Sequence, residues 1–408
     1  MSFDTRSLAI ATAGFCAFVN LYNVQALLPD LAAEFGVSAS EVSWLMTAGT
    51  GAIALTAPFT GVLADVLGRK RLITAAMFAV VVPTLLSGPS SVDEAIERLE
   101  IHYLSNASDD LTLALLSDWN DAPSETMPTD EPILRRAQEG IARLNRSHPR
   151  ADGDRFLLLH RRRLWSETQD CWLGWERKRG KLQELNRLLR GATDTTFMAI
   201  GGVAPKVPDN VRFVITLDSD SRLPRDAVRR LVGKMAHVIN QPRFDPARKL
   251  VVEGYGILQP RVTLALPHGS EGSWFQRVFS GARGMDPYAS PVSDVYQDLF
   301  GEGTFLGKGI YDVDAFEASM EGRSPENAIL SHDLFEGIFA RAGLAGDVEV
   351  VEAFPRRYDV ATSRQHRWAR GDWQLLGWLV ERKRLPGMGG PATLLGRADL
   401  VVDEDGCA

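Results

Sequence analysis

The stretch VRFVITLDSD, residues 211–220, places six residues with the composition of a buried strand almost directly before two carboxylates. Two acids aimed past a strand end repel each other unless a cation lies between them, and a hard divalent ion combines such carboxylates with phosphate oxygens. The chain has three other Asp-x-Asp triplets, at 152–154, 312–314 and 403–405, but only Asp218 and Asp220 follow a six-residue strand. The stretch therefore predicts a strand that ends at a metal and diphosphate site.

The same strand pattern recurs along the chain, each time followed by a helical pattern. Strands are predicted at 79–86, 111–118, 155–160 and 211–216, with helices at 92–103, 131–144, 181–189 and 225–240. The strands are almost continuously apolar, as expected when helices cover both faces of a sheet. This alternation predicts an α/β fold with a mostly parallel, Rossmann-like sheet, and ligands bind such sheets beyond the carboxyl ends of the strands. We expect the first strand to end near Pro83.

Two motifs before residue 211 suit a nucleoside diphosphate. Asp118 ends the second predicted strand, where an acid accepts hydrogen bonds from a nucleobase; the alternative is a turn or helix-capping residue. The segment ERKRGKLQELN, residues 176–186, supplies bases for a diphosphate; the alternative is a solvated basic turn. For the nearby run His160-Arg161-Arg162-Arg163, we favour a surface position over a phosphate-facing one.

Three motifs after residue 290 suit a sugar and a proton transfer. The segment 294–316 packs glycines around Lys308, which lets a sugar approach the backbone. His332 and Asp333 precede an amphipathic helix, with helix capping as the alternative role for Asp333. RQHRWARGDWQ, residues 364–374, combines aromatic faces for sugar rings with guanidinium groups for phosphate; the alternative for Trp368 is a core position.

This ordered set of motifs resembles the catalytic domain of membrane-bound family 2-type (GT-A) glycosyltransferases. Longer segments, among them LLSDWNDA, GWERKRGKLQELNRLLRGATDT, ITLDSDSRLP, LSHDLFEGIFARAGL and RQHRWARGDWQLL, resemble the glycosyltransferase domain of cyclic β-1,2-glucan synthases over residues of about 80–377. The resemblance implies an inverting enzyme that transfers glucose from UDP-glucose to a growing β-1,2-glucan. The partners would be a nucleotide sugar and a glucan acceptor.

The resemblance also implies roles for individual residues. Asp118 would hold the uracil, Lys181 the diphosphate, and Asp218 with Asp220 the donor and a Mg²⁺ or Mn²⁺ ion. Asp333 would be the general base. Arg367 and Trp368 would support the acceptor and the leaving diphosphate, and Arg364, at the usual glutamine position of the motif, would also contact the donor. His332 stands where many relatives have glutamate.

The first 80 residues have a different composition from the rest. The chain of 408 residues carries a net charge of −7, which argues against a general nucleic-acid partner. No Lys or Arg occurs from Ser7 to Gly68, and the apolar runs 8–28 and 44–62 are long enough to cross a bilayer as helices. Bases follow the second run, so we expect a hairpin in a bacterial-type inner membrane with both ends in the cytoplasm.

The segment GVLADVLGRKR, residues 61–71, resembles the loop between the second and third helices of major facilitator transporters. In that family the acid and bases of this loop gate the helix bundle, which would correspond to Asp65, Arg69 and Lys70. We favour a plain cytoplasmic anchor, since such transporters need about a dozen helices. The run 72–86 fits either a third span or a strand; a third span would place the catalytic part outside the cytoplasm, so we favour the strand.

The predicted organisation is a transmembrane segment at 1–79, a GT-A glycosyltransferase domain at 80–380 and an unassigned tail at 381–408. The partners expected beside the substrates are the lipid bilayer and a protein that supplies the export helices found after the tryptophan motif in relatives. The competing interpretations are a transporter fragment, or an inactive fusion that acts only as a membrane or interaction module.

Overall fold

The computed structural model describes residues 77–265, 272–280, 295–323 and 332–379. These residues lie in a compact unit formed by Ile73–Ala408. The predicted spans at 8–28 and 44–62 and the tail at 381–408 lie outside the described residues, so the predicted domain boundaries stay predictions. Within the described residues, every helix is too short or too polar to cross a bilayer.

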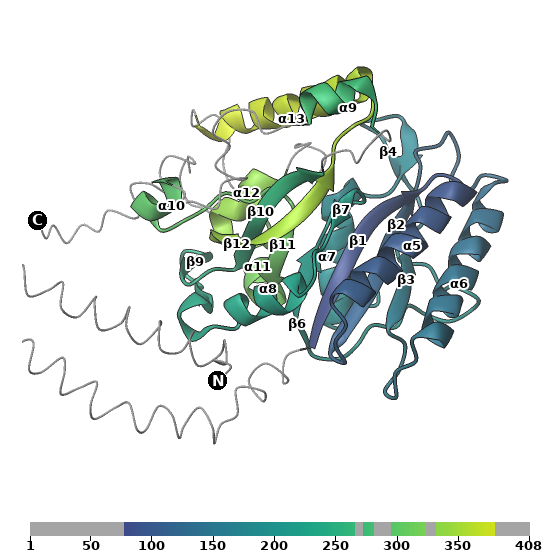
Figure 1. The fold of residues 1–408 in the computed structure, drawn as a ribbon, viewed down its shortest axis with the longest axis horizontal. Coiled ribbons are helices and arrows are strands. Elements are labelled where there is room, and N and C mark those ends of the chain that lie inside the picture. The colour runs from purple at the N-terminus through teal and green to yellow at the C-terminus, as the bar shows by residue number, and fades with distance from the viewer. Residues whose placement is uncertain (1–76, 266–271, 281–294, 324–331, 380–408) are drawn as a thin grey trace, which may run out of the picture. The chain divides into compact units, whose positions relative to one another are not determined.

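The predicted α/β sheet is present, and half of it is entirely parallel (Figure 1). Its strands are β1 (Met77–Leu86), β2 (Leu111–Trp119), β3 (Phe156–His160) and β6 (Val211–Thr216), in the order β3-β2-β1-β6. The helices that follow these strands are α5 (Pro89–Ser105), α6 (Asp130–Ser147), α7 (Arg177–Leu189) and α8 (Ala227–Met235). Each predicted strand and helix of this half is confirmed, with ends that move by a few residues.

Strand β1 does not end near Pro83 as predicted but continues to Leu86. A proline is tolerated here because β1 pairs with β6 only as far as Val81, whereas it pairs with β2 to its end. The Val81 carbonyl accepts a bond from the Leu217 amide, so Pro83, two residues on, faces the same side beyond the last pair. The missing N–H of Pro83 therefore interrupts no ladder.

The other half of the sheet is mixed and has no counterpart in the sequence prediction. From β6 outward the order is β11 (Gly309–Asp312), β10 (Ile257–Ala265), β12 (Ala342–Ala353) and β7 (Ser221–Arg222). Strand β11 is antiparallel to both β6 and β10, β12 is parallel to β10, and β7 is antiparallel to β12. The described part of the sheet is thus mostly, but not wholly, parallel.

The remaining elements are short, except for one long helix. Two small antiparallel sheets pair β4 (Leu164–Ser166) with β5 (Cys171–Leu173), and β8 (Arg243–Asp245) with β9 (Leu250–Glu253). A 3-10 turn spans Val238–Asn240, and the helices are α9 (Trp274–Phe279), α10 (Val295–Phe300), α11 (Val313–Met320), α12 (Asp333–Phe339) and α13 (Tyr358–Leu379).

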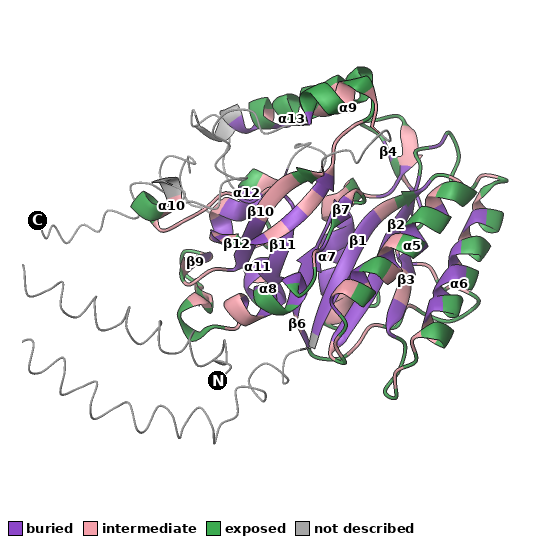
Figure 2. Cartoon of the chain, in the orientation of Figure 1, coloured by how far each residue is buried: buried purple, intermediate pink, exposed green. Residues whose placement is uncertain are grey.

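Two apolar cores hold helices on opposite faces of the sheet. Phe78, Val80 and Val82 of β1 belong to the core that includes α5, α6 and α8. The alternate residues Ala79 and Val81 belong to the core that includes α7 and α11. Successive residues of a strand point to opposite faces, and burying each large aliphatic side chain contributes about 1.5–3 kcal/mol. Buried strands between half-exposed helices, and the largely exposed α13, are visible in Figure 2.

Candidate active site at the carboxyl edge of the sheet

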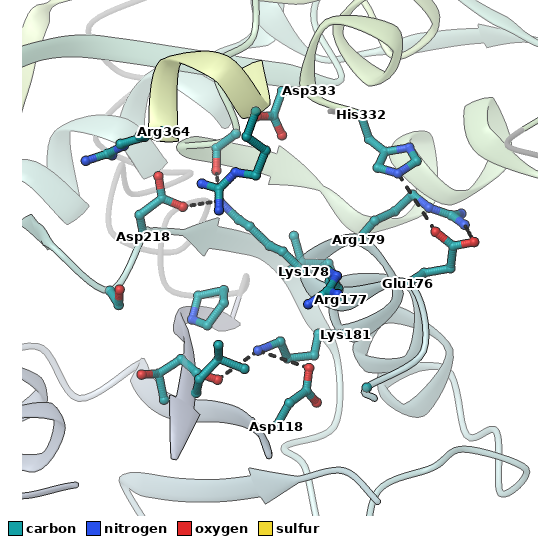
Figure 3. Close-up of a pocket in the computed structure, with 18 of the residues that line it drawn as sticks. Asp118, Glu176, Arg177, Lys178, Arg179, Lys181, Asp218, His332, Asp333 and Arg364 are labelled. Atoms are coloured by element: carbon teal, nitrogen blue, oxygen red, sulfur yellow. Dashed lines mark hydrogen bonds and ion pairs between the residues drawn. The ribbon is translucent and has the colours of Figure 1, made fainter. Parts of the chain in front are cut away.

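A cavity of about 820 Å³ lies where the carboxyl ends of β1, β2 and β6 meet α7, α12 and α13. The position agrees with the rule that ligands bind beyond the carboxyl ends of parallel strands. Every residue predicted for the site lines this one cavity: Asp118, Lys181, Asp218, Asp220, Asp333, Arg364, Arg367 and Trp368. Figure 3 shows five of them by label, with side chains that come from both sides of the cavity. Their individual roles remain predictions.

At one end of the cavity Asp118 is part of a buried network of charges. Its carboxylate accepts two hydrogen bonds from the Arg161 guanidinium, at 2.8 and 2.9 Å, and Arg161 is fully buried. Arg161 also donates to Glu184 at 3.0 Å. Burial alone would raise the pKa of Asp118, but the charges of Lys181 and Arg161 outweigh it and lower the pKa. We call Asp118, Arg161, Lys181 and Glu184 the Asp118 network.

The predicted surface position of the run at residues 160–163 is wrong for three of its four residues. His160, Arg161 and Arg163 are buried, and only Arg162 is exposed. Arg163 pairs with Asp130 at 2.6 Å. Arg161 and Arg163 are buried because each reaches an acid and a carbonyl, which compensates the cost of removing the charge from water. The alternative for Asp118 as a turn residue is also wrong, since Asp118 lies within β2.

Lys181 belongs to the Asp118 network rather than to the open part of the cavity. Its ammonium donates to the Thr84 carbonyl at 2.9 Å and lies 3.3 Å from an Asp118 oxygen. The side chain is only 4% exposed. Burial lowers the pKa of Lys181 to about 8, although the charge of Asp118 opposes this. The alternative of a solvated basic turn is therefore wrong for Lys181.

At the other end of the cavity Asp218 lies between two lysines. Lys178 donates to one Asp218 oxygen at 2.5 Å, and the Lys308 ammonium lies 3.2 Å from the other. Burial would raise the pKa of Asp218, but the charges of Lys178 and Lys308 outweigh it and lower the pKa to about 2. Asp218 is therefore a carboxylate at any physiological pH, as a metal ligand must be.

The carboxylate cluster consists of Asp218, Asp220 and Glu352, whose oxygens lie within 4.8 Å of one another. Glu352 lies near the end of β12, far along the chain from the other two acids. Arg364 bridges the cluster, donating to Asp220 at 3.1 Å and to Glu352 at 2.9 Å, and Lys308 lies 3.0 Å from Glu352. Three oxygen ligands of this kind suit Mg²⁺ or Mn²⁺, so the residues fit the predicted ion.

Asp333 differs from these acids because no cation of the described residues lies at bonding distance from it. It is the first residue of α12, the N-cap is His332, and no side chain caps the helix, so the capping role considered for Asp333 is wrong. Among the residues that the structure describes, none donates a hydrogen bond to the Asp333 carboxylate or lies within 4.0 Å as an ion pair. Burial raises the pKa of Asp333, although the charge of Lys178 opposes this.

Gly307 leaves the space that the Asp333 carboxylate occupies. A Cβ atom at residue 307 would lie 2.6 Å from an Asp333 oxygen, and the φ angle of Gly307 is +77°. Both facts require glycine, because other residues are strained in this region and a methyl group would overlap the carboxylate. One turn along α12, burial and the charge of Asp333 raise the pKa of the buried Glu336.

The long helix α13 borders the cavity with a half-exposed aromatic ring. Trp368 is 45% exposed, so the alternative of a core position is wrong. The guanidinium of Arg364 lies 4.9 Å from the centre of the Trp368 ring, in the geometry of a cation–π contact. Arg367 is exposed and also lines the cavity.

Sequence reasoning missed four functional candidates, which are Arg161, Lys178, Glu352 and Glu336. A signal existed for Lys178, since it lies in the segment 176–186 that is predicted to supply bases for a diphosphate, but the motif resemblance assigns that role to Lys181. Strain marks the same turn: Glu176 and Arg177 both have φ of +48°, which is uncommon away from glycine and concentrates at functional sites. Glu352 carried no signal, because nothing local connects it with Asp218.

Comparison with known proteins gives two separate similarities. The chain is 55% identical over 304 residues, 74% of its length, to the cyclic beta-(1,2)-glucan synthase NdvB of Rhizobium meliloti, of which it spans 11%. It is 38% identical over 81 residues to the inner membrane transport protein YnfM of Escherichia coli, of which it spans 19%. It is also 33% identical over 84 residues to an uncharacterized transporter of Buchnera aphidicola.

The model of the Major Facilitator Superfamily matches residues 10–93. This match therefore extends past the predicted junction and includes all of β1. Both resemblances inferred from the motifs are confirmed: three quarters of the chain is similar to part of a cyclic β-1,2-glucan synthase, and the N-terminal part is similar to major facilitator transporters.

Proposed function

We propose that residues of about 80–380 form an inverting glycosyltransferase of the GT-A type that transfers glucose from UDP-glucose to a β-1,2-glucan. One observation carries the proposal: Asp333, an acid with no cation within 4.0 Å among the described residues, shares a cavity with a charge-compensated carboxylate cluster. An inverting displacement needs a base that takes the acceptor's proton and a cation that stabilises the departing diphosphate. In this cavity Asp333 would be the base, and the carboxylate cluster would hold the cation. The identity to a glucan synthase supports the choice of sugar and linkage.

In this proposal Asp333 is the general base. Its carboxylate accepts the proton of the acceptor's 2-hydroxyl as that oxygen bonds to the anomeric carbon of glucose. The bond from this carbon to the phosphate oxygen breaks at the same time, and UDP departs with the electron pair. The raised pKa of Asp333 suits the role, because a base works best when its pKa approaches the working pH.

Asp218, Asp220 and Glu352 would hold a Mg²⁺ or Mn²⁺ ion, which supplies positive charge for the departing diphosphate. Asp118 would hold the uracil at the other end of the cavity. Trp368, Arg364 and Arg367 line the cavity; the exposed Trp368 ring would stack on an acceptor sugar, and the two arginines would contact the donor's phosphates.

We further propose that the transporter-like N-terminal part tethers the enzyme to a bacterial inner membrane, with the catalytic part in the cytoplasm. The similarity to an inner membrane transport protein supports the tether. A partner that supplies export helices would then receive the product. The competing proposal is a transporter-derived membrane module without catalysis, which the same similarity favours for the first 80 residues.

The test uses the full chain in detergent, with labelled UDP-glucose, Mn²⁺ and a β-1,2-glucan acceptor. Asp333→Asn removes the base, so transfer should fall about 10³-fold while UDP binding stays within twofold of the parent. Asp220→Asn should weaken both UDP binding and Mn²⁺ binding. Asp154→Asn is the matched control, because Asp154 is the last residue of another Asp-x-Asp triplet and is exposed.

Equal turnover by Asp333→Asn and the parent would reject the assignment of the base. A parent that binds neither UDP nor Mn²⁺ would favour the membrane-module proposal. A parent that binds UDP with Mn²⁺ but transfers nothing would identify the chain as an inactive fusion.

A further inference from the structure

Four basic side chains at the start of α7 pair with four different acids. Arg177 pairs with Asp121 at 2.8 Å, Arg179 with Glu176 at 3.1 Å, Lys181 with Asp118 at 3.3 Å and Lys178 with Asp218 at 2.5 Å. Of these acids only Asp218 belongs to the carboxylate cluster. The start of α7 therefore spans the cavity, with Lys181 at the Asp118 end and Lys178 at the Asp218 end (Figure 3).

The positive charge of Lys181 is already balanced by Asp118, so it is not available to a diphosphate. The Asp118 network contains two acids and two bases, and both of its bases lie within 3.3 Å of an acid. The Lys181 ammonium also donates to the Thr84 carbonyl. Moving Lys181 onto a phosphate would leave Asp118 with one cation in a buried site, and burying a partly compensated charge is costly.

Lys178 is in the opposite situation. Its side chain is 31% exposed in the cavity, and its other polar contact is the Gly307 carbonyl at 2.6 Å. Within the part of the chain that the structure describes, Asp218 is the only carboxylate within 4.0 Å of Lys178. Lys308, by contrast, is only 7% exposed, and both acids that it contacts, Asp218 and Glu352, belong to the carboxylate cluster.

A divalent ion held by the carboxylate cluster would weaken the ion pairs that Lys178, Lys308 and Arg364 make with it, and Lys178 has the most exposed side chain of these three cations. The ion would bind the Asp218 oxygen to which Lys178 now donates a hydrogen bond, and its charge would repel the Lys178 ammonium at short range. Lys178 then needs an anion beside the metal, and the diphosphate of the donor is the anion that binds there.

We propose that Lys178 contacts the diphosphate, and that Lys181 is a positioning residue that holds Asp118 for the nucleobase. This inference rests on the proposed function, because it assigns two lysines within the same nucleotide site. It differs from the roles implied by the motif resemblance, in which Lys181 itself held the diphosphate.

Comparing UDP with uridine separates the two roles, because uridine has the base and sugar without the phosphates. Binding of both is measured by calorimetry on the full chain in detergent with Mn²⁺. Lys178→Met should weaken UDP about 10-fold or more and leave uridine within twofold of the parent. Lys178→Arg should restore part of the UDP affinity. Lys181→Met should weaken UDP and uridine by the same factor, and the exposed Lys206→Met should change neither.

Equal weakening of UDP and uridine by Lys178→Met would overturn the inference, as would loss of UDP alone in Lys181→Met. If Lys181→Met does not fold, the Lys178→Met comparison decides by itself, because that half-exposed side chain is not part of the core. A parent that binds neither ligand contradicts the proposed function instead, so the two failures are distinguishable.

Discussion

The two ends of the cavity use charge in different ways. The Asp118 network is buried, and its acids are matched by guanidinium and ammonium groups within the protein. The Asp218 end is partly open, and Lys178, Lys308 and Arg364 contact its carboxylate cluster, whereas no cation of the described residues lies within 4.0 Å of Asp333. The first end is fixed before any ligand arrives, whereas charges at the second must rearrange when one binds.

The largest expected difference between the ends is in stability. Arg161→Met leaves Asp118 and Glu184 with too little positive charge in a buried site, so the free energy of unfolding should fall by about 3–5 kcal/mol. Lys178→Met removes a partly exposed pair and should cost less than about 1 kcal/mol. Chemical unfolding followed by tryptophan fluorescence measures both. Similar decreases in the free energy of unfolding for the two variants would contradict the proposed difference between the two ends of the cavity.

The second prediction concerns the space beside the base. Gly307→Ala places a methyl group on the Asp333 carboxylate, so transfer should fall about 100-fold while UDP binding is kept. Gly202→Ala is the matched control, since its φ of +78° gives the same backbone cost and, among the described residues, only its chain neighbours approach the added carbon within 4 Å. Full activity in Gly307→Ala would show that the Asp333 side chain can shift to make room for the methyl group, and would contradict a fixed position for the base.

The smallest expected difference between the two ends is in the pH range over which each one lowers the stability of the fold. Burial lowers the pKa of His160, beside Asp118, to about 3 from the usual 6.5. Between these values the unfolded chain binds more protons, so stability falls as the pH falls from 6.5, by about 2 kcal/mol at pH 5. Asp218, with its pKa lowered to about 2, adds acid sensitivity only below about pH 4.

His160→Asn tests this assignment, because the asparagine amide can keep the bond that His160 Nδ1 makes with Ser117 at 2.8 Å. The variant should lose less stability than the parent between pH 6.5 and pH 5, as measured by unfolding at both values. An unchanged slope would place the acid sensitivity elsewhere, for example at the buried His102, whose pKa burial lowers to about 4.

The parallel half of the fold could be predicted from sequence because its signals are local. Strands such as 211–216 are continuous apolar runs, and helix patterns follow them at short distances. Strand β12 gave no such signal, since Gly343 and Gly346 interrupt it and its buried positions alternate with half-exposed ones. Its place beside β10 is set by tertiary packing.

The same distinction holds for the site. Asp218 and Asp220 follow a recognisable strand, and Asp333 lies in a recognisable motif, so all three could be named from sequence. Glu352 could not, because its contact with Arg364 joins β12 to α13 through folding alone. Arg161 was misread for a related reason: a run of bases looks solvated until the acids that bury it are known.

Strand β1 affects how the two parts of this chain can be separated. It hydrogen-bonds to β2 on one side and β6 on the other, yet it lies inside the segment 10–93 that resembles a transporter. A deletion made where that resemblance stops would remove one of the two interior strands of the parallel half and leave β2 and β6 without a common neighbour. A shortened chain that is meant to keep the whole sheet should therefore start ahead of Met77, so that the strand shared with the transporter-like segment is retained.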